Sequence, residues 1–319
     1  MFDESGTQGM ITSAPKRTRR LAGWAGLVAG CVALPVGAQE LEPRLYSNAP
    51  PGVNFIVAGY GHSQGSVLPD PSVGIEDAQI EIDGPVVGYA RTLSVAGDSA
   101  QAAMAIGHVC LDGSAEFAGQ RFTRDVCGWT DARIRLAWNF FGAPSMSLRE
   151  FAAYRQDLII GASVTINVPV GNYDPARLAN IGTNRWAFKA EAGVSKALAR
   201  WTLELSGAAA FFETNNAFFG GKSRQQDPMY SLQGHVIYGF ASGIWLAANA
   251  TWYRGGRTSS DGLPNRDLQS STRAGVTLSF PLSRRQSVKM AASTGITART
   301  GSDFDTITAA WQYRFGAGL

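Results

Sequence analysis

The sequence predicts an all-β chain that folds as a twelve-stranded antiparallel transmembrane β-barrel of the bacterial outer membrane. Three observations lead to this prediction. Segments of roughly ten residues alternate between apolar and polar side chains, the links between them alternate between long and short, and the N-terminus has the features of an export signal. The composition agrees, because the chain has 37 glycines and only 17% charged residues, fewer charges than a soluble domain usually carries.

The export signal occupies residues 1–38. Basic residues at 16–20 precede an apolar run, Leu21–Pro35, and Val36–Ala38 matches a small-residue cleavage site. Residues 1–15 are polar and form an upstream extension if Met10 is the true start. The apolar run is too short for a membrane-spanning helix, which is the alternative.

Cysteine usage leaves two further choices open. Lipidation at Cys31 is an alternative to simple cleavage, but the apolar run continues past it to the conventional site. After cleavage, Cys110 and Cys127 remain as a candidate disulfide, since an exported chain meets an oxidising compartment; two free thiols are the alternative. The mature chain has 24 basic and 23 acidic residues, so nothing indicates nucleic-acid binding.

The expected strands are identified by period-2 alternation. In chain order they are 52–60, 79–92, 99–110, 133–141, 158–168, 184–194, 200–211, 229–240, 244–254, 271–280, 287–296 and 306–315. The first three and 244–254 are the weaker ones. In 133–141, Ile134 and Leu136 share one face while Arg133 and Arg135 share the other. An even count is typical of single-chain outer-membrane barrels.

Link lengths predict which end of the barrel faces outward. Long links are expected at 61–77, 111–128, 169–184, 213–227 and 255–268, and short links at 93–98, 195–200, 241–243 and 281–286. Long extracellular loops and short periplasmic turns are the pattern of these barrels. Two links break it, because 141–153 is long for a turn and 299–304 is short for a loop.

The alternative architecture is a soluble β-sandwich or lipocalin-like barrel with its apolar faces inward. Its outer faces would carry many charges, whereas the polar faces here carry mainly Ser, Thr, Gly and Asn. The apolar faces end in aromatic residues, which favours girdles at a membrane interface. The last strand shows this, with Trp311, Tyr313 and Phe315 on one face and Arg314 on the other.

The inward faces supply the candidate functional residues. The pore-lining candidates are Arg133, Arg135, Arg185, Lys189, Glu191, Glu204, Gln233, His235, Arg273, Lys289 and Arg314. Basic residues outnumber acidic ones, which favours a lining selective for small anions. The alternative is a network of Arg–Glu pairs that braces the wall, because side chains fill much of a barrel of this size.

No catalytic, metal or cofactor site is predicted. Outer-membrane lipid hydrolases place a Ser two residues from a strand His, but His235 is followed at that spacing by Ile237. His108 precedes Cys110 and His62 lies in a predicted long link, so no group of metal ligands is evident. The Gly-rich pieces at 220–222 and 255–257 precede no helix and are interpreted as turns.

Several blocks resemble a known family. NIGTNRWAFK, FFGGK, QDPMYSLQGHVIYGF, WYRGGRT and TGSDFDT, with LEPRLYSNAPPGVNF at the start of the mature chain, are similar to outer-membrane proteins associated with the meta-pathway of phenol degradation. The resemblance spans roughly 41–319 and implies a β-barrel that moves small, often aromatic, compounds across the outer membrane. One departure is that Phe315 is followed by Gly-Ala-Gly-Leu, whereas insertion signals usually end on an aromatic residue.

The expected organisation is a signal peptide, an N-terminal periplasmic segment at 39–51 and a barrel at 52–319. The sequence leaves open whether 39–51 plugs the lumen or hangs in the periplasm. The expected function is diffusion of small organic solutes, aromatic or anionic, with outer-membrane lipid, the solute and the barrel-insertion machinery as partners. The alternatives are a structural or adhesion barrel with a plugged lumen, an outer-membrane lipid-modifying enzyme, and a soluble periplasmic barrel.

Overall fold

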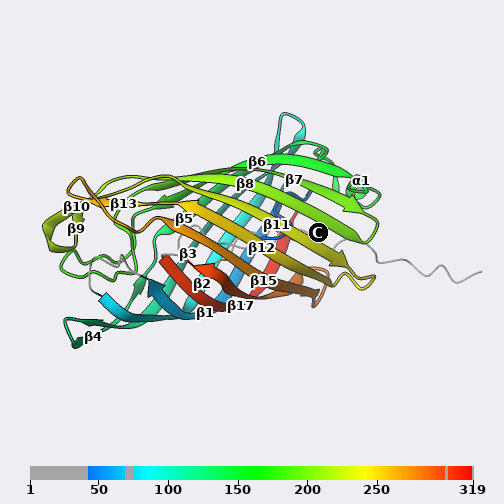
Figure 1. Cartoon of the computed structure of the whole chain (residues 1–319). Coiled ribbons are helices and arrows are strands. Elements are labelled where there is room, and N and C mark those ends of the chain that lie inside the picture. The colour runs from blue at the N-terminus through cyan, green and yellow to red at the C-terminus, as the bar shows by residue number, and fades with distance from the viewer. Residues whose placement is uncertain (1–41, 69–74, 299–300, 318–319) are drawn as a thin grey trace, which may run out of the picture.

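The computed structural model describes residues 42–68, 75–298 and 301–317, and the predicted signal peptide lies outside them. It is a closed antiparallel barrel (Figure 1). The strands are β1 (Val53–Leu68), β2 (Ile75–Val95), β3 (Asp98–Phe117), β4 (Gln120–Trp129), β5 (Ala132–Phe141), β6 (Leu158–Val168), β7 (Ala187–Leu198), β8 (Trp201–Phe212), β9 (Asn215–Phe218), β10 (Lys222–Gln226), β11 (Met229–Gly239), β12 (Trp245–Gly255), β13 (Thr258–Ser260), β14 (Leu263–Pro264), β15 (Gln269–Pro281), β16 (Gln286–Ala298) and β17 (Gly301–Gly316). One short helix, α1 (Leu148–Phe151), lies in the β5–β6 link.

The barrel wall has twelve positions, as predicted. Thirteen strands are hydrogen-bonded in one sheet. β4 and β5 together occupy one position of the wall, because both pair with β3. β4 pairs with β3 from His108 onward, and β5 pairs with β3 up to Ala105. The wall closes where β1 pairs with β17, from Val53↔Gly316 to Leu68↔Gly301. The prediction that the last strand pairs with the first is therefore confirmed. Closure leaves no unpaired edge, which a membrane requires of a β structure.

The two ends of the barrel differ. The end that carries the short turns, α1 and the last described residues is called the turn end here, and the opposite end is called the loop end. Figure 1 shows the turn end on the right. At the loop end, β9, β10, β13 and β14 form a separate four-stranded sheet. None of the helical segments in the described part of the chain has the length or apolar content to cross a bilayer.

Two of the predicted long links are wrong in length. The predicted loops at 61–77 and 111–128 are mostly strand, because β1 and β2 continue pairing to Ser66↔Gln79 and β3 and β4 to Phe117↔Gln120. Their outward faces are polar, as His62, Glu81 and Asp112 show, and so lack the apolar surface that marks strands in lipid. Their backbones pair nonetheless, because each extension has a neighbouring strand to receive its hydrogen bonds.

The outward face is apolar and exposed. Large side chains at least a third exposed include Leu136, Val164, Leu205 and Val276, an arrangement that suits lipid and would be costly in water. Aromatic residues gather outward near the turn end, where Trp201, Tyr238 and Phe240 make edge contacts and Trp311, Tyr313 and Phe315 stack. This is the girdle predicted for the last strand.

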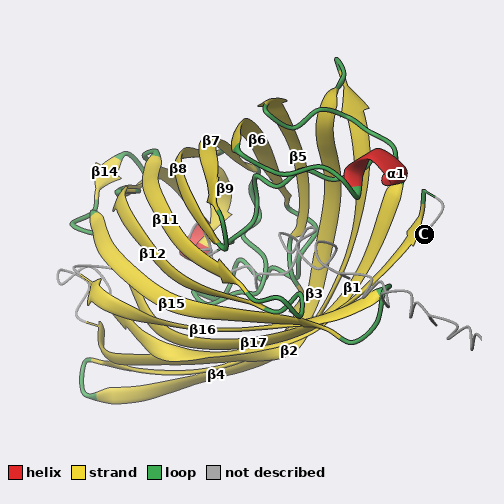
Figure 2. Ribbon diagram, turned by 90° about the vertical axis from the view of Figure 1, so that its right-hand side faces the viewer, coloured by secondary structure: helices red, strands yellow, loops and turns green. Residues whose placement is uncertain are grey.

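Residues 42–50 lie inside the barrel. Glu42, Tyr46 and Asn48 are at most 7% exposed, and Figure 2, a view into the barrel, shows irregular chain within the ring of strands. The described part of the N-terminal segment is thus a lumenal element, the first of the two placements that the sequence left open. Pro43 and Pro50 are fully buried, and proline suits a segment that joins no strand ladder.

Candidate functional site: the lumen and its N-terminal segment

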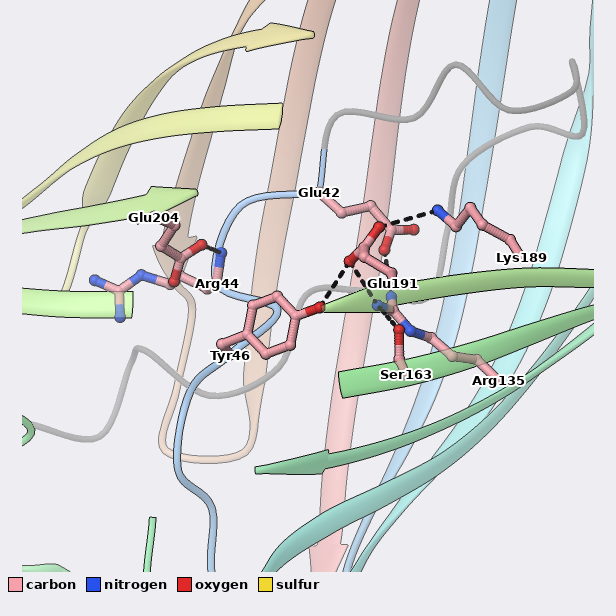
Figure 3. A network of polar contacts seen from close by, with 8 residues as sticks. All are labelled: Glu42, Arg44, Tyr46, Arg135, Ser163, Lys189, Glu191 and Glu204. Atoms are coloured by element: carbon pink, nitrogen blue, oxygen red, sulfur yellow. Dashed lines mark hydrogen bonds and ion pairs between the residues drawn. The ribbon is translucent and has the colours of Figure 1, made fainter. Parts of the chain in front are cut away.

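An ionic network on the inner wall holds the start of the N-terminal segment (Figure 3). Arg135 of β5 places Nη1 2.5 Å from Glu42 Oε2 and Nη2 3.6 Å from Glu191 Oε1. Arg135 Nη2 also donates to Ser163 Oγ at 3.1 Å, and Lys189 Nζ lies 3.3 Å from Glu191 Oε2. Since removal of one partner would leave a buried charge unpaired, these groups hold one another in place.

Tyr46 sits on a seat made by two glycines. Its hydroxyl donates to Glu191 Oε1 at 2.9 Å, and its ring packs against Gly161 and Gly193, which are direct partners on β6 and β7. A Cβ at Gly193 would lie 2.3 Å from Tyr46 Cε2, and one at Gly161 would lie 2.8 Å from Tyr46 Cδ1. Both positions need glycine because the ring approaches the backbone closely.

The neighbouring strands hold Arg44. Its backbone N–H donates to Glu204 Oε2 at 2.7 Å, and Glu204 Oε1 accepts from Ser195 Oγ at 3.0 Å. The Arg44 guanidinium lies 5.2 Å from the ring centroid of Trp245, a buried inward residue of β12. The segment therefore reaches across the lumen from β5 to β12.

The rest of the segment binds the wall near the turn end. Asn139 Nδ2 donates to the carbonyl of Ser47 at 3.1 Å, and Asn48 Nδ2 donates to the carbonyl of Pro144 at 3.1 Å. Ser99 Oγ donates to the carbonyl of Ala49 at 3.2 Å. These bonds are mainly between side chains and backbone, not a strand ladder.

Other sequence-predicted lining residues bond to further positions on the inner wall. Arg273 donates to the carbonyl of Phe304 at 2.7 Å, and Arg314 donates to the carbonyl of Arg284 at 2.7 Å. His235 Nδ1 lies 2.8 Å from Asn249 Oδ1, a pairing that orients the imidazole but activates no nucleophile. Gln233 is buried, whereas Arg133, Arg185 and Lys289 are half-buried.

Two groups lie on the outward face of the loop-end extensions. Cys110 and Cys127 are register partners on β3 and β4 and are joined by a disulfide. His62 Nδ1 lies 2.8 Å from Asp83 Oδ1 and 3.8 Å from Glu81 Oε1, a grouping of metal-ligand types that sequence spacing did not reveal. The β1–β2 register creates it, and all three side chains are at least a third exposed.

The network contains residues that were not singled out from the sequence. Glu42, Arg44 and Tyr46 were missed because they precede the first strand, in a segment with no periodicity. One signal could have indicated them: Gly161 and Gly193 occupy inward positions on adjacent strands, where a side chain would be expected to help fill the lumen. Four network residues were candidates, and the structure brings Arg135, Glu191 and Glu204 into contact with the N-terminal segment. The fourth, Lys189, pairs with Glu191.

Comparison with known proteins places the chain in a family. Residues 58–312 match the family described as "Putative MetA-pathway of phenol degradation". The chain belongs to this family. The match lies within the barrel, so the family assignment does not depend on the N-terminal segment, and no curated protein matches the chain in sequence.

Solved structures show the same fold. An outer membrane channel from Pseudomonas putida F1 is 20% identical with a TM-score of 0.74, over 86% of this chain and 100% of that one. The β-domain of the Bordetella autotransporter BrkA is 13% identical with a TM-score of 0.53, over 83% of this chain and 100% of that one. The predicted fold class, an outer-membrane β-barrel, is confirmed.

Proposed function

We propose that this family member is an outer-membrane channel through which small organic solutes diffuse, and that residues 42–50 partly occlude its lumen. The observation that carries the proposal is the contrast between the barrel wall and the N-terminal segment inside it. The wall is a continuous hydrogen-bonded ladder, whereas the segment is irregular and is held by individual side-chain contacts. A segment held in this way moves at far lower cost than a strand, because its release breaks no ladder.

Polar side chains behind the segment support a path for solutes. Four strands contribute buried polar side chains to the inner wall, namely Arg135, Ser163, Thr165, Gln233 and Asn249. Displacement of the segment would therefore leave a lumen that water can fill. Movement of solute would then need no energy source, as in other diffusion channels.

The test is solute entry into liposomes that contain the purified protein. Wild-type protein should admit benzoate or a sugar of similar size faster than protein-free liposomes do. The double variant Glu42→Gln/Tyr46→Phe should admit it faster still, because it removes the segment's carboxylate that pairs with Arg135 and the hydroxyl that bonds Glu191. Glu150→Gln, a change in the exposed helix α1, is the matched control and should leave the rate unchanged.

A closed structural barrel is the second candidate. The close fit of Tyr46 on Gly161 and Gly193 favours it, because a tight seat suits a permanent plug. If neither the wild type nor the double variant admits solute or conducts ions in planar bilayers, the channel proposal fails and the structural barrel is supported.

A further inference from the structure

Two arginines at the loop end lie over aromatic rings. Arg185 precedes β7, and its guanidinium carbon lies 4.8 Å from the ring centroid of Phe212. Arg224 on β10 lies 5.0 Å from the ring centroid of Phe218. Phe212 packs against an inward cluster that includes Met229, so this pair of arginines stands at the mouth of the lumen.

The two guanidinium groups are close to each other. Arg185 Nη2 donates to the side-chain oxygen of Gln226, which follows Arg224 by two residues on β10. Residues two apart on a strand share a face and lie about 7 Å apart. The mouth therefore concentrates two positive charges on one side.

Neither arginine has an ion-pair partner within the described ranges 42–68, 75–298 and 301–317. The acidic residues that influence them electrostatically are Asp131 and Asp267, and both carboxylates are engaged elsewhere. Asp131 accepts from the N–H of Thr183 at 2.9 Å, and Asp267 accepts from the N–H of Thr258 at 2.8 Å. Arg185 Nη1 is buried without a hydrogen-bond acceptor.

The electrostatic environment of Arg185 also favours a bound anion. Burial, and then the nearby charge of Arg224, lower the pKa of Arg185 to about 10. Arg185 is still charged at neutral pH, so the two cations repel each other in a partly dehydrated place. A bound anion would relieve both the repulsion and the missing hydrogen bond.

The surroundings of the pair are held rigidly. Asn215, which is 3% exposed, donates to the hydroxyl of Tyr173 at 2.9 Å and accepts from Asn184 Nδ2 at 3.0 Å. These bonds tie the β6–β7 link to the β9–β10 hairpin. Tyr173, Phe212 and Phe218 are half-buried, so aromatic surface remains beside the guanidinium groups in a preorganised frame.

We propose that Arg185 and Arg224 bind the carboxylate of a small aromatic acid at the mouth of the lumen. The two arginines donate charge-assisted hydrogen bonds to the carboxylate oxygens, and the neighbouring rings contact the solute's ring. This inference rests on the proposed channel function and names its substrate class. The site would raise the local concentration of such acids at the entrance.

The test is isothermal titration calorimetry on the full-length protein in detergent, with benzoate, benzyl alcohol and acetate as probes. Benzoate should bind the wild type more tightly than either of the others, because only benzoate has both the ring and the charge. Arg185→Gln and Arg224→Gln should each weaken benzoate binding roughly ten- to hundredfold. Arg257→Gln, which changes an exposed loop-end arginine, should bind benzoate as the wild type does.

Any one of several binding results would overturn the proposal. These are benzyl alcohol binding as tightly as benzoate, acetate binding as tightly as benzoate, or Arg257→Gln weakening binding as much as the other two changes. Migration of unheated samples in gels checks that each variant is folded, and the two arginine variants test the site independently. Benzoate binding without liposome flux would contradict the proposed channel function but not the carboxylate site. Flux without binding that depends on the two arginines would contradict the carboxylate site but not the channel function.

Discussion

Gly193 should control whether the N-terminal segment stays in the lumen. In Gly193→Ala, the new Cβ would lie 2.3 Å from Tyr46 Cε2 and 2.8 Å from Cζ, closer than an aromatic ring tolerates. Gly161 on the neighbouring strand β6 contacts the same ring, and a Cβ there would lie 2.8 Å from Cδ1. The ring cannot slide aside on the wall, so we expect it to leave its seat.

The size of the effect follows from what Tyr46 loses. Burial of an aromatic side chain contributes about 1.5–3 kcal/mol, and a hydrogen bond to a charged group about 1.5–3 kcal/mol. Tyr46 is 1% exposed and bonds Glu191 at 2.9 Å, so both contributions apply. The loss of about 3 kcal/mol or more shifts docking of the segment by roughly a hundredfold or more. The barrel's own stability should be kept, because alanine suits a strand better than glycine by about 0.5–1 kcal/mol.

The assay is the rate at which a thiol reagent labels Ala49→Cys, a small replacement at a residue that is 2% exposed. Labelling should be roughly a hundredfold faster in the Gly193→Ala background than in the native one. The control is Gly207→Ala on β8, where the nearest atom to a new Cβ is the carbonyl oxygen of Ser231 at 3.9 Å. Equal labelling rates in the two glycine variants would refute the inference that the contact between Tyr46 and Gly193 holds the segment in the lumen.

Three further predictions concern the wall. Arg135→Ala should lower the free energy of unfolding by about 3–5 kcal/mol, because it leaves the buried carboxylate of Glu42 without its cation; an unchanged urea midpoint in detergent would contradict this. Leu136→Arg, on the outward face, should cost about 2–4 kcal/mol in folding into liposomes if it lies near the midplane, whereas Leu263→Arg at the loop end should cost almost nothing. The double change Cys110→Ser/Cys127→Ser should destabilise the β3–β4 extension by about 3 kcal/mol, seen as protease cleavage of its tip while the barrel resists. Cleavage at the same rate with the disulfide intact would count against that role.

The strand pattern could be predicted because a membrane wall imposes a strict local rule. Each spanning strand shows one face to lipid and one to the lumen, so Ile134 and Arg135 must alternate wherever the chain crosses. Outside the bilayer that rule lapses, and the extensions of β1 to β4 were predicted as loops. The pairing Cys110↔Cys127 lies in such an extension, where the cysteines themselves were the only local signal.

The sequence by itself determined the fold class, the twelve-strand count and the inward residues, because these depend on periods of two along the chain. Only the tertiary structure decided which inward residues meet. Tyr46 and Glu191 are 145 residues apart, and Arg44 and Glu204 are 160 apart. Closure of the barrel brings them within hydrogen-bond distance, and a loop-end bond from Arg185 to Gln226 brings Arg185 near Arg224. Such contacts depend on register and curvature summed over many strands, which no short stretch of sequence records.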